Sequence, residues 1–409
     1  MNKNITLGVS VVLIITAIII LGRYRSAVPE TTSSEAVSLA ANQDAPAEGT
    51  SNNPDLVKTE ADINQVKPTT VETLTAKQKL AKYETGKELA GIAGYINTPD
   101  GLTLQSLVGK KVIIVDFWTY SCINCQRTLP YMNDWYAKYK DQGLEIIGVH
   151  TPEFAFEKVL ANVQTAVANY NIKYPVVLDN DYGTWKAYQN RYWPRKYIID
   201  IDGYVVYDHI GEGGYAETEK KIQELLAERA KKLGVTANAY QELSFPVVDA
   251  PVGGAVSPEV YFGSSRNSYL GNGSSGQSGV QTFSEPSGFK THVLYLSGAW
   301  NITSEYATSQ ANAKIIYRYI AKNVFFVASS GEQEGVGKEP IVVEVLRDGK
   351  PLTADSAGED VVIGSDGKST VTISTAKLYK LIKQAGREEH TLELIPQVEG
   401  LEAFTFTFG

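Results

Sequence analysis

The two cysteines of this 409-residue chain lie only three positions apart, as Cys122 and Cys125. The apolar run from Val112 to Val115 precedes them and a helical pattern follows, so the pair is placed where a buried strand leads into a helix. If that helix begins at Cys122, the two thiols lie at positions i and i+3, on one face and within bonding reach. The pattern therefore predicts a strand, a turn and a helix whose first turn carries the reactive groups.

The N-terminus of such a helix is suited to a reactive thiol. Unpaired backbone N–H groups and the positive end of the helix dipole favour the thiolate of Cys122 over the thiol. The thiolate is the species that attacks a disulfide, so we expect thiol–disulfide exchange, with a Cys122–Cys125 disulfide as the oxidised form.

Asp116 lies near the end of the strand that precedes the cysteines. Burial there should raise the pKa of its carboxyl group. We expect Asp116 to accept the proton of Cys125 when this second thiol attacks a mixed disulfide. The alternative is a hydrogen-bonded residue at a strand end without a catalytic role.

Metal binding and structural crosslinking fit this cysteine pair less well. Zinc usually takes four ligands in two closely spaced pairs, whereas the histidines here, His150, His209, His292 and His390, are scattered. A disulfide that closes so short a loop stabilises a fold little. We therefore expect neither a metal nor a cofactor.

A resemblance to a known family rests on three segments: DFWTYSCINCQRTLPYMNDWY (Asp116 to Tyr136), GVHTPEFAFEKV (Gly148 to Val159) and NRYWPRKYIIDIDG (Asn190 to Gly203). They resemble the thioredoxin superfamily, and within it the membrane-tethered TlpA/ResA-like branch and the thioredoxin domain of DipZ-type proteins. The resemblance covers roughly Glu84 to the chain end. It implies an α/β thioredoxin-like sandwich, with Cys122 as nucleophile, Cys125 as resolving thiol and Asp116 as the buried strand carboxylate.

The same resemblance implies further roles around the cysteines. Pro130 matches the proline that bends the active-site helix, and Pro194 matches the cis-proline that faces the cysteine pair. Trp193 would then present its backbone to an extended substrate strand. We accordingly expect Tyr120, Trp193 and Pro194 to contact substrate. His150 and Glu153 follow the second predicted strand, on the side of the active site, and they either tune the pKa of the thiols or contact substrate, or only shape the loop.

The chain departs from the family pattern at three places. Ile123-Asn124 separates the cysteines, which leaves the direction of electron flow open. Thr128 stands where ResA-like reductases carry a glutamate, which puts specialised cytochrome c maturation in doubt. Ser121 stands where ordinary thioredoxins have tryptophan, which argues against a general cytoplasmic thioredoxin. Sco-like copper delivery would need a C-x-x-x-C pair, one residue longer than the spacing here.

The N-terminal region predicts a membrane anchor. Ile5 to Gly22 is an apolar run without charge, just long enough to cross a hydrocarbon core, and Arg23 and Arg25 follow it. No small-x-small cleavage motif follows directly, which favours an uncleaved single-pass helix over a signal peptide. The charges that flank the run, Lys3 on one side and two arginines on the other, do not place the catalytic domain outside. The family resemblance implies the extracytoplasmic side of the cell membrane, and protein disulfides form in that compartment.

Composition and element pattern then divide the chain. The net charge of −8 argues against a nucleic-acid partner. The predicted divisions are the anchor 1–25, a disordered linker 26–83, a thioredoxin-like catalytic domain 84–235, a linker 236–256 and a C-terminal domain 257–409.

The catalytic domain should alternate strands and helices. Its expected strands are Lys111–Phe117, Leu144–His150, Tyr197–Asp202 and Tyr204–His209, and its expected helices are Cys122–Lys140, Phe156–Tyr170, Tyr182–Arg191 and Ala216–Leu233. Asp202-Gly203 predicts a hairpin turn. The resemblance adds an extra hairpin around Leu102–Gly109.

The C-terminal region predicts an all-β sandwich. Its short alternating runs are Thr291–Leu296, Ala313–Tyr319, Val324–Ala328, Ile341–Arg347, Val361–Ile363, Thr370–Ile373, Thr391–Ile395 and Ala403–Phe408. SPEVYFG (Ser257 to Gly263) and FTFTFG (Phe404 to Gly409) resemble the jelly-roll-like, carbohydrate-binding-module-like domain of DipZ-type proteins.

The function of this second domain is left between two interpretations. Tyr295, Trp300 and Tyr306 would stack on the sugar rings of a cell-envelope glycan, although aromatic residues in alternating strands more often belong to a core. We prefer docking against the catalytic domain or a protein partner.

Three functions follow for the whole chain. The first is an extracytoplasmic thiol–disulfide oxidoreductase that reduces protein disulfides and receives electrons from a CcdA-like membrane protein. The second is a redoxin-type peroxidase, because Thr119 and Cys122 form a T-x-x-C pattern, although Val115 replaces the proline expected upstream. The third is a non-catalytic binding protein of the cell envelope, and the cysteine pair favours the first of these.

Overall fold

The computed structural model describes residues 74–236, 257–333 and 336–409. The predicted membrane helix Ile5–Gly22, the linker up to residue 73 and the linker 237–256 lie outside these residues. Within the described residues, no helix is both long enough and apolar enough to cross a membrane. The two described regions, 74–236 and 257–409, are treated separately below.

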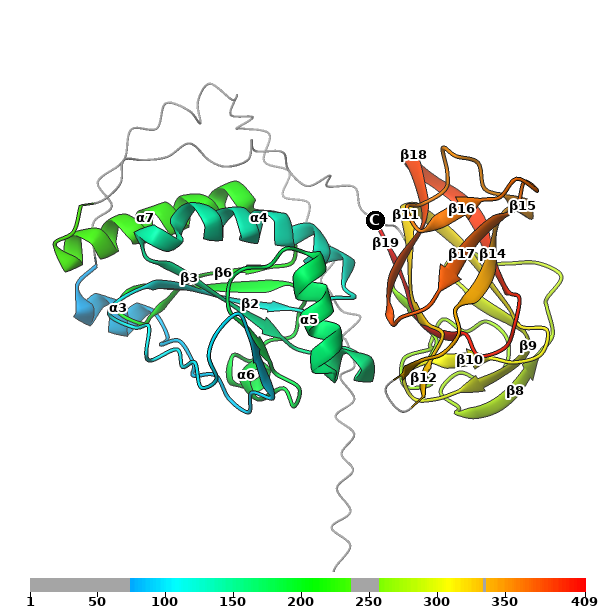
Figure 1. The fold of residues 1–409 in the computed structure, drawn as a ribbon, viewed down its shortest axis with the longest axis horizontal. Helices are drawn as coiled ribbons and strands as arrows, with labels where there is room; N and C mark the ends of the chain where they lie inside the picture. The colour runs from blue at the N-terminus through cyan, green and yellow to red at the C-terminus, as the bar shows by residue number, and fades with distance from the viewer. Residues whose placement is uncertain (1–73, 237–256, 334–335) are drawn as a thin grey trace, which may run out of the picture. The chain divides into compact units, whose positions relative to one another are not determined.

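The first region alternates strands and helices along the chain (Figure 1). Its elements are α3 (Ala76–Lys82), β1 (Gly94–Ile96), β2 (Val112–Trp118), α4 (Ile123–Tyr139), the 3₁₀ turn η1 (Lys140–Gln142), β3 (Leu144–His150), the 3₁₀ turn η2 (Ala155–Lys158), α5 (Leu160–Asn169), β4 (Val176–Leu178), α6 (Gly183–Ala187), β5 (Arg195–Ile199), β6 (Val205–Ile210) and α7 (Tyr215–Leu233).

These strands form one mixed sheet in the order β1-β4-β3-β2-β5-β6. β2, β3 and β4 are parallel, whereas β5 pairs antiparallel with both β2 and β6. All seven residues of the central strand β2 are buried, because layers cover both faces of the sheet. α4, α5 and α7 pack on one face and α6 on the other (Figure 1). This is the α/β thioredoxin-like architecture predicted from the sequence.

Most of the predicted elements of this region are confirmed within a few residues. β3 occupies the predicted range, and β5 and β6 form the predicted hairpin. Two expectations differ. The predicted helix Phe156–Tyr170 is divided into η2 and α5, and the extra hairpin at Leu102–Gly109 is wrong, because these residues form turns and β1 pairs instead with β4.

The second region consists of strands. They are β7 (Val260–Tyr261), β8 (Gly279–Phe283), β9 (Leu294–Ile302), β10 (Ala307–Ser309), β11 (Lys314–Ser329), β12 (Glu332–Gln333), β13 (Val336–Gly337), β14 (Ile341–Arg347), β15 (Lys350–Pro351), β16 (Val361–Ile363), β17 (Ser369–Ile373), β18 (Lys377–Pro396) and β19 (Glu402–Phe408).

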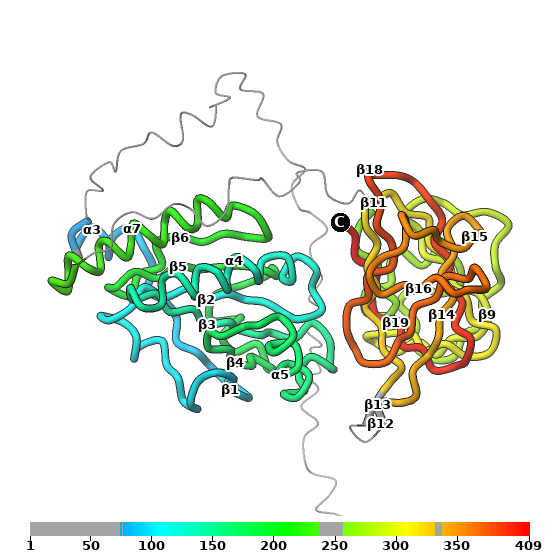
Figure 2. The backbone as a smooth tube through the Cα atoms, turned by 45° about the horizontal axis from the view of Figure 1, so that its top comes forward, coloured from blue at the N-terminus to red at the C-terminus, as the bar shows by residue number. Residues whose placement is uncertain are grey.

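Two long antiparallel strands, β11 and β18, pair with each other (Figure 2) and stand in the middle of the strand order of this β-rich region. Their pairing shifts register near Ala321, where the ladder is interrupted, and this allows such long strands to bend. Strands on either side continue the hydrogen bonding in the order β16-β17-β14-β18-β11-β19-β10-β9-β8. The predicted β-rich domain is therefore confirmed, but the predicted runs Ala313–Tyr319 and Val324–Ala328 are parts of the single strand β11.

Aromatic residues form much of the core of the β-rich region. Trp300 is fully buried and Tyr295 is 5% exposed. The Tyr295 hydroxyl accepts a hydrogen bond from the backbone of Lys290, and the Trp300 indole N–H donates to the Ser297 carbonyl group. These two rings belong to the core, as the sequence favoured, and are not available to stack on a sugar.

Candidate active site

The cysteine pair lies at the start of α4, as predicted. Cys122 is the N-cap residue, in extended conformation, and its Sγ accepts a hydrogen bond of 3.3 Å from the backbone N–H of Cys125. Both residues are free thiols in the structure; Cys122 is partly exposed and Cys125 is buried. The outer thiol can therefore meet a substrate, while the inner thiol can reach only Cys122 and groups of the protein interior.

Asp116 lies beneath this pair, within β2. Its side chain is 1% exposed, and its Oδ1 has no hydrogen-bond partner among the described residues. Burial raises the pKa of Asp116 to about 7, and the positive charge of Lys196 opposes this shift. A carboxyl group with that pKa exchanges its proton near neutral pH, as a proton acceptor in this position requires.

The inner thiol is electrostatically connected to this carboxyl group. Burial, together with the nearby thiol of Cys122, raises the pKa of Cys125, and the charge of Asp116 acts in the same direction. Cys125 thus holds its proton until a neighbouring group accepts it. Asp116, in β2, lies close enough for its charge to act on Cys125.

Lys196 is a buried lysine that sequence reasoning did not single out. It lies in β5, directly opposite Asp116 in the antiparallel register, and its side chain is fully buried. Burial lowers the pKa of Lys196, and the charges of Asp116 and Cys125 oppose this shift. The sequence shows a lysine two positions after Pro194, beside an apolar run, and this was the one sign of a buried lysine. Its partner Asp116 is seen only in the pairing of β2 with β5.

Pro194 begins the turn into β5, and the Trp193–Pro194 peptide bond is cis, as the resemblance implied. The carbonyl oxygen of Trp193 lies 4.0 Å from Cys122 Sγ. The indole N–H of Trp193 donates to the Thr151 carbonyl group, and its ring packs 4.2 Å from that of Trp185. The structure thus brings Trp193 and Pro194 next to the nucleophile.

Tyr120 and His150 lie on neighbouring strand ends. Their rings stack with centroids 5.7 Å apart, and His150 Nε2 lies 3.4 Å from Thr119 Oγ1. Burial lowers the pKa of His150 to about 3, so the imidazole is neutral at physiological pH. His150 therefore contributes no positive charge to the thiols.

Glu157, in η2, is a second residue that sequence reasoning did not single out. It is fully buried, and its carboxylate accepts hydrogen bonds from Ser121 and from the backbone N–H groups of Glu153 and Phe154. The position of Glu157 in the segment after β3 indicated only a loop helix. Its hydrogen bonds to Ser121 form only because the segment after β2 and the segment after β3 lie against each other in the fold.

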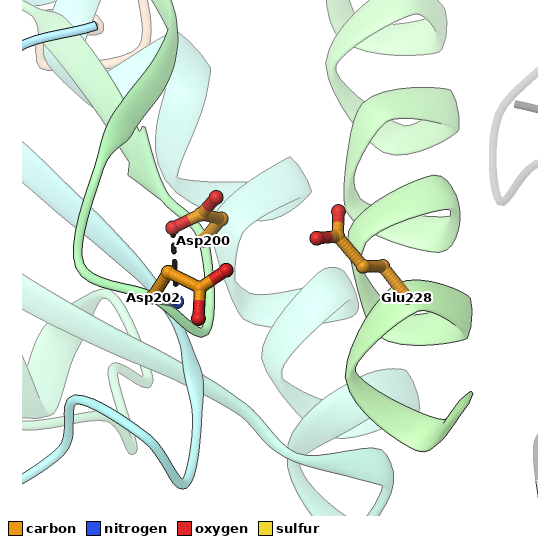
Figure 3. Close-up of side chains that lie close together, drawn as sticks. All are labelled: Asp200, Asp202 and Glu228. Atoms are coloured by element: carbon orange, nitrogen blue, oxygen red, sulfur yellow. Dashed lines mark hydrogen bonds between the residues drawn. The ribbon is translucent and has the colours of Figure 1, made fainter. Parts of the chain in front are cut away.

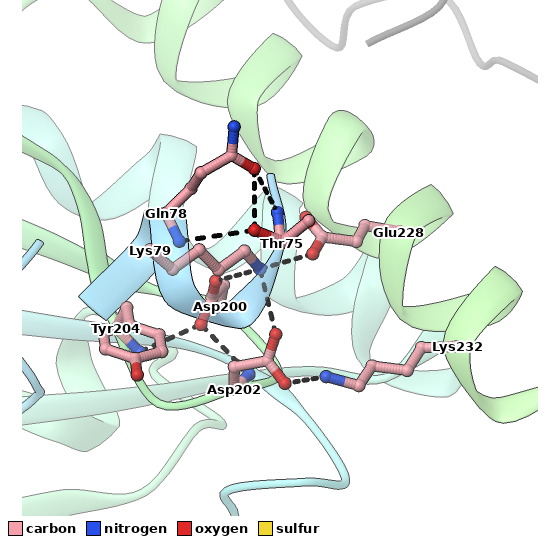
Figure 4. A network of polar contacts seen from close by, with 8 residues as sticks. All are labelled: Thr75, Gln78, Lys79, Asp200, Asp202, Tyr204, Glu228 and Lys232. Carbon is pink, nitrogen blue, oxygen red and sulfur yellow. Dashed lines mark hydrogen bonds and ion pairs between the residues drawn. The ribbon is translucent and has the colours of Figure 1, made fainter. Parts of the chain in front are cut away.

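A cluster of three carboxylates, Asp200, Asp202 and Glu228, has ligand oxygens within 4.8 Å of one another (Figure 3). The ammonium group of Lys79 binds all three, at 2.6, 3.0 and 2.5 Å respectively (Figure 4). Burial lowers the pKa of Lys79, but the hydrogen bonds to Asp200 and Glu228 outweigh it and leave the pKa raised. The cluster therefore holds its own cation and attaches α3 to the sheet.

Comparison with known proteins agrees with this geometry. Residues 97–208 match the family described as AhpC/TSA, and residues 257–409 match the family described as thioredoxin like C-terminal domain. The thiol-disulfide oxidoreductase YkuV of Bacillus subtilis is 30% identical over 141 residues, which are 34% of this chain and 93% of YkuV. ResA of Bacillus cereus is 32% identical over 144 residues, 35% of this chain and 80% of ResA.

A longer match extends over both described regions. Protein DipZ of Mycobacterium tuberculosis is 39% identical over 328 residues, which are 80% of this chain. The same residues are 43% of DipZ, so this chain spans less than half the length of that relative.

Proposed function

We propose that this chain, which belongs to the thiol–disulfide oxidoreductases of the thioredoxin superfamily, uses Cys122 and Cys125 to reduce disulfides in protein substrates. One observation supports this most: a partly exposed thiol at a helix N-terminus lies beside a buried thiol that is coupled to a buried carboxyl group. The outer thiol is placed to attack and the inner thiol is placed to resolve.

The proposed reaction has two exchange steps. The Cys122 thiolate attacks one sulfur of the substrate disulfide, forms a mixed disulfide and releases the other substrate sulfur as a thiolate. Cys125 then attacks Cys122 Sγ and gives its proton to Asp116, so that the second substrate sulfur leaves and the Cys122–Cys125 disulfide forms. Two electrons pass from the cysteine pair to the substrate.

Two residues near the cysteine pair support the roles proposed for Cys122 and Asp116. Trp193 carries its carbonyl group next to Cys122, where an extended substrate would pair with it. The positive charge of Lys196 limits the rise that burial causes in the pKa of Asp116. The pKa of this proposed proton acceptor therefore stays near neutral pH.

The peroxidase alternative has less support. The T-x-x-C pattern would need the Thr119 hydroxyl group at the reacting sulfur. That hydroxyl instead lies 3.4 Å from His150 Nε2. For the β-rich region we propose docking of a protein, since two of the three candidate sugar-stacking rings are buried.

We also propose that the chain is held in the cell membrane by Ile5–Gly22, with the cysteines on the extracytoplasmic side. A reductant must itself be reduced after each turnover, and in that compartment the electrons must cross the membrane. A CcdA-like membrane protein is the proposed donor.

The test is to trap the mixed disulfide. In Cys125→Ser, the second step is blocked, so a disulfide-linked adduct between Cys122 and a reducible protein such as insulin should accumulate. Cys122→Ser should form no adduct and should lose insulin reduction. Reduction that persists in Cys122→Ser would refute the proposal, because it would not depend on the proposed nucleophile.

A further inference from the structure

Glu157 is bonded to the two loops that flank the cysteine pair. Its Oε1 accepts hydrogen bonds from the backbone N–H and the hydroxyl group of Ser121, at 3.2 and 2.6 Å. Its Oε2 accepts from the backbone N–H groups of Glu153 and Phe154, at 2.6 and 3.1 Å. Oε1 therefore accepts hydrogen bonds from the segment after β2, and Oε2 accepts them from the segment after β3, so the carboxylate joins the two segments.

The position of Ser121 makes this link relevant to the chemistry. Ser121 immediately precedes Cys122, whose extended conformation lets its sulfur cap α4. A rotation of the Ser121 peptide group would move Cys122 Sγ relative to the Trp193 carbonyl group. Displacement of a reacting atom by about 1 Å can lower a rate by roughly a hundred-fold.

Four donors to one buried carboxylate form a specific arrangement. All of them point hydrogens at Glu157. A glutamine would keep the shape but place an NH₂ group against some of these donors.

We propose that Glu157 is a positioning residue for the nucleophile: it holds Ser121, and through Ser121 it fixes the approach of Cys122 Sγ to a substrate disulfide. The inference rests on the proposed role of Cys122. Glu157 does not touch the substrate and exchanges no electrons, so its effect must appear as a change in the reactivity of Cys122 in the folded protein.

The experiment compares Glu157→Gln with Glu219→Gln in the full chain. Glu219 is also buried and accepts from the Tyr139 hydroxyl group, near the far end of α4. Both substitutions remove a buried, hydrogen-bonded carboxylate, so both should lower the melting temperature. Only Glu157→Gln should alter the cysteine loop.

Two readouts separate positioning from stability. The first is the plateau rate of insulin reduction, measured at alkaline pH where the rate no longer rises with pH; Glu157→Gln should lower it by about ten-fold or more. The second is the NMR signal of the Ser121 amide proton, which should move upfield when it loses the charged acceptor. Glu219→Gln should leave both readouts as in the unsubstituted chain.

The outcomes that overturn the proposal are distinct. If Glu157→Gln lowers the melting temperature but keeps the plateau rate and the Ser121 signal, the carboxylate is structural only. If Glu157→Gln does not fold, Ser121→Ala decides, because it removes only the 2.6 Å hydrogen bond; an unchanged plateau rate there also overturns the proposal. If the unsubstituted chain reduces no disulfide, the proposed function fails, and the Ser121 signal alone still tests the link.

Discussion

At the scale of single residues, the central feature is an acid and a base that the fold buries opposite each other. Asp116 and Lys196 come from strands far apart in the sequence and meet through the register of β2 and β5. Neither ionises without a cost, because burial disfavours both charges. The pKa of Asp116 therefore depends on the charge of Lys196, and the pKa of Lys196 depends on the charge of Asp116.

The first prediction concerns Asp116→Asn and stability. The pKa of Asp116 is raised from 3.8 to about 7 on folding, so the folded chain binds this proton more tightly than the unfolded chain. Its favourable contribution is complete below pH 3.8 and is lost as the pH rises towards 7. Denaturant unfolding at pH 8 should therefore show Asp116→Asn to be the more stable chain, by on the order of 4 kcal/mol.

One outcome of this comparison would contradict the role of Asp116. If the two chains respond to pH in the same way between pH 4 and 8, Asp116 does not titrate near neutrality, and its assignment as proton acceptor fails.

The second prediction concerns Lys196→Met and the pH dependence of the reaction. The charge of Lys196 lowers the pKa of Asp116, so its removal should raise that pKa further. The pH at which resolution of the mixed disulfide reaches half of its maximum rate should move upward by about one pH unit. Stopped-flow measurement of mixed-disulfide resolution checks this, and Asp116→Asn in the same background should abolish the midpoint.

At the scale of elements, Lys79 attaches α3 to the rest of the fold. It is buried, and its ammonium group binds Asp200, Asp202 and Glu228 (Figure 4). Removing one partner of a buried ionic cluster leaves uncompensated charge. The residues before the sheet are thereby fixed to the hairpin between β5 and β6.

The third prediction follows from that cluster. Lys79→Met should destabilise the chain at neutral pH by about 3 kcal/mol, because three carboxylates lose their shared cation. Lys77 is exposed on the same helix and provides the matched control, since Lys77→Met removes an equal charge without exposing the cluster. Equal denaturation midpoints for the two variants would show that the Lys79 contacts do not stabilise the fold.

The elements also show which parts of the structure are predictable from the sequence. Leu144–His150 was predicted to the residue, because seven apolar-rich positions carry a clear signal. β1 and β4 were missed, because strands of three residues carry no periodicity. β18 was recognised only near its end. Its middle, Gln384 to Arg387, is mostly polar and lies where the pairing with β11 is interrupted, so no alternating pattern runs along the whole strand.

The same limit applies to the candidate site. The spacing of Cys122, Cys125 and Asp116 carries their chemistry, whereas Pro194 was singled out by the family resemblance. Lys196 and Glu157 act across the fold: one through strand register and the other through the meeting of two loops. No local pattern encodes either partner.

At the scale of the whole molecule, the proposed location can be tested with the protein's own cysteines. The chain has no thiols other than Cys122 and Cys125. If these face the outside, a membrane-impermeant maleimide should label the reduced chain in intact protoplasts, and Cys122→Ser with Cys125→Ser should abolish labelling. Labelling that appears only after lysis would place the cysteines in the cytoplasm and refute the proposed location.

The direction of electron flow is also a property of the whole molecule, because it must match the donor and the compartment. The measurement that tests the central claim most directly is the equilibrium reduction potential of the Cys122–Cys125 pair in the protein. A reductase requires a reversible two-electron titration near the thioredoxin end of the scale, roughly −270 mV. A potential near roughly −120 mV would mean a donor of disulfides and would contradict the proposed function.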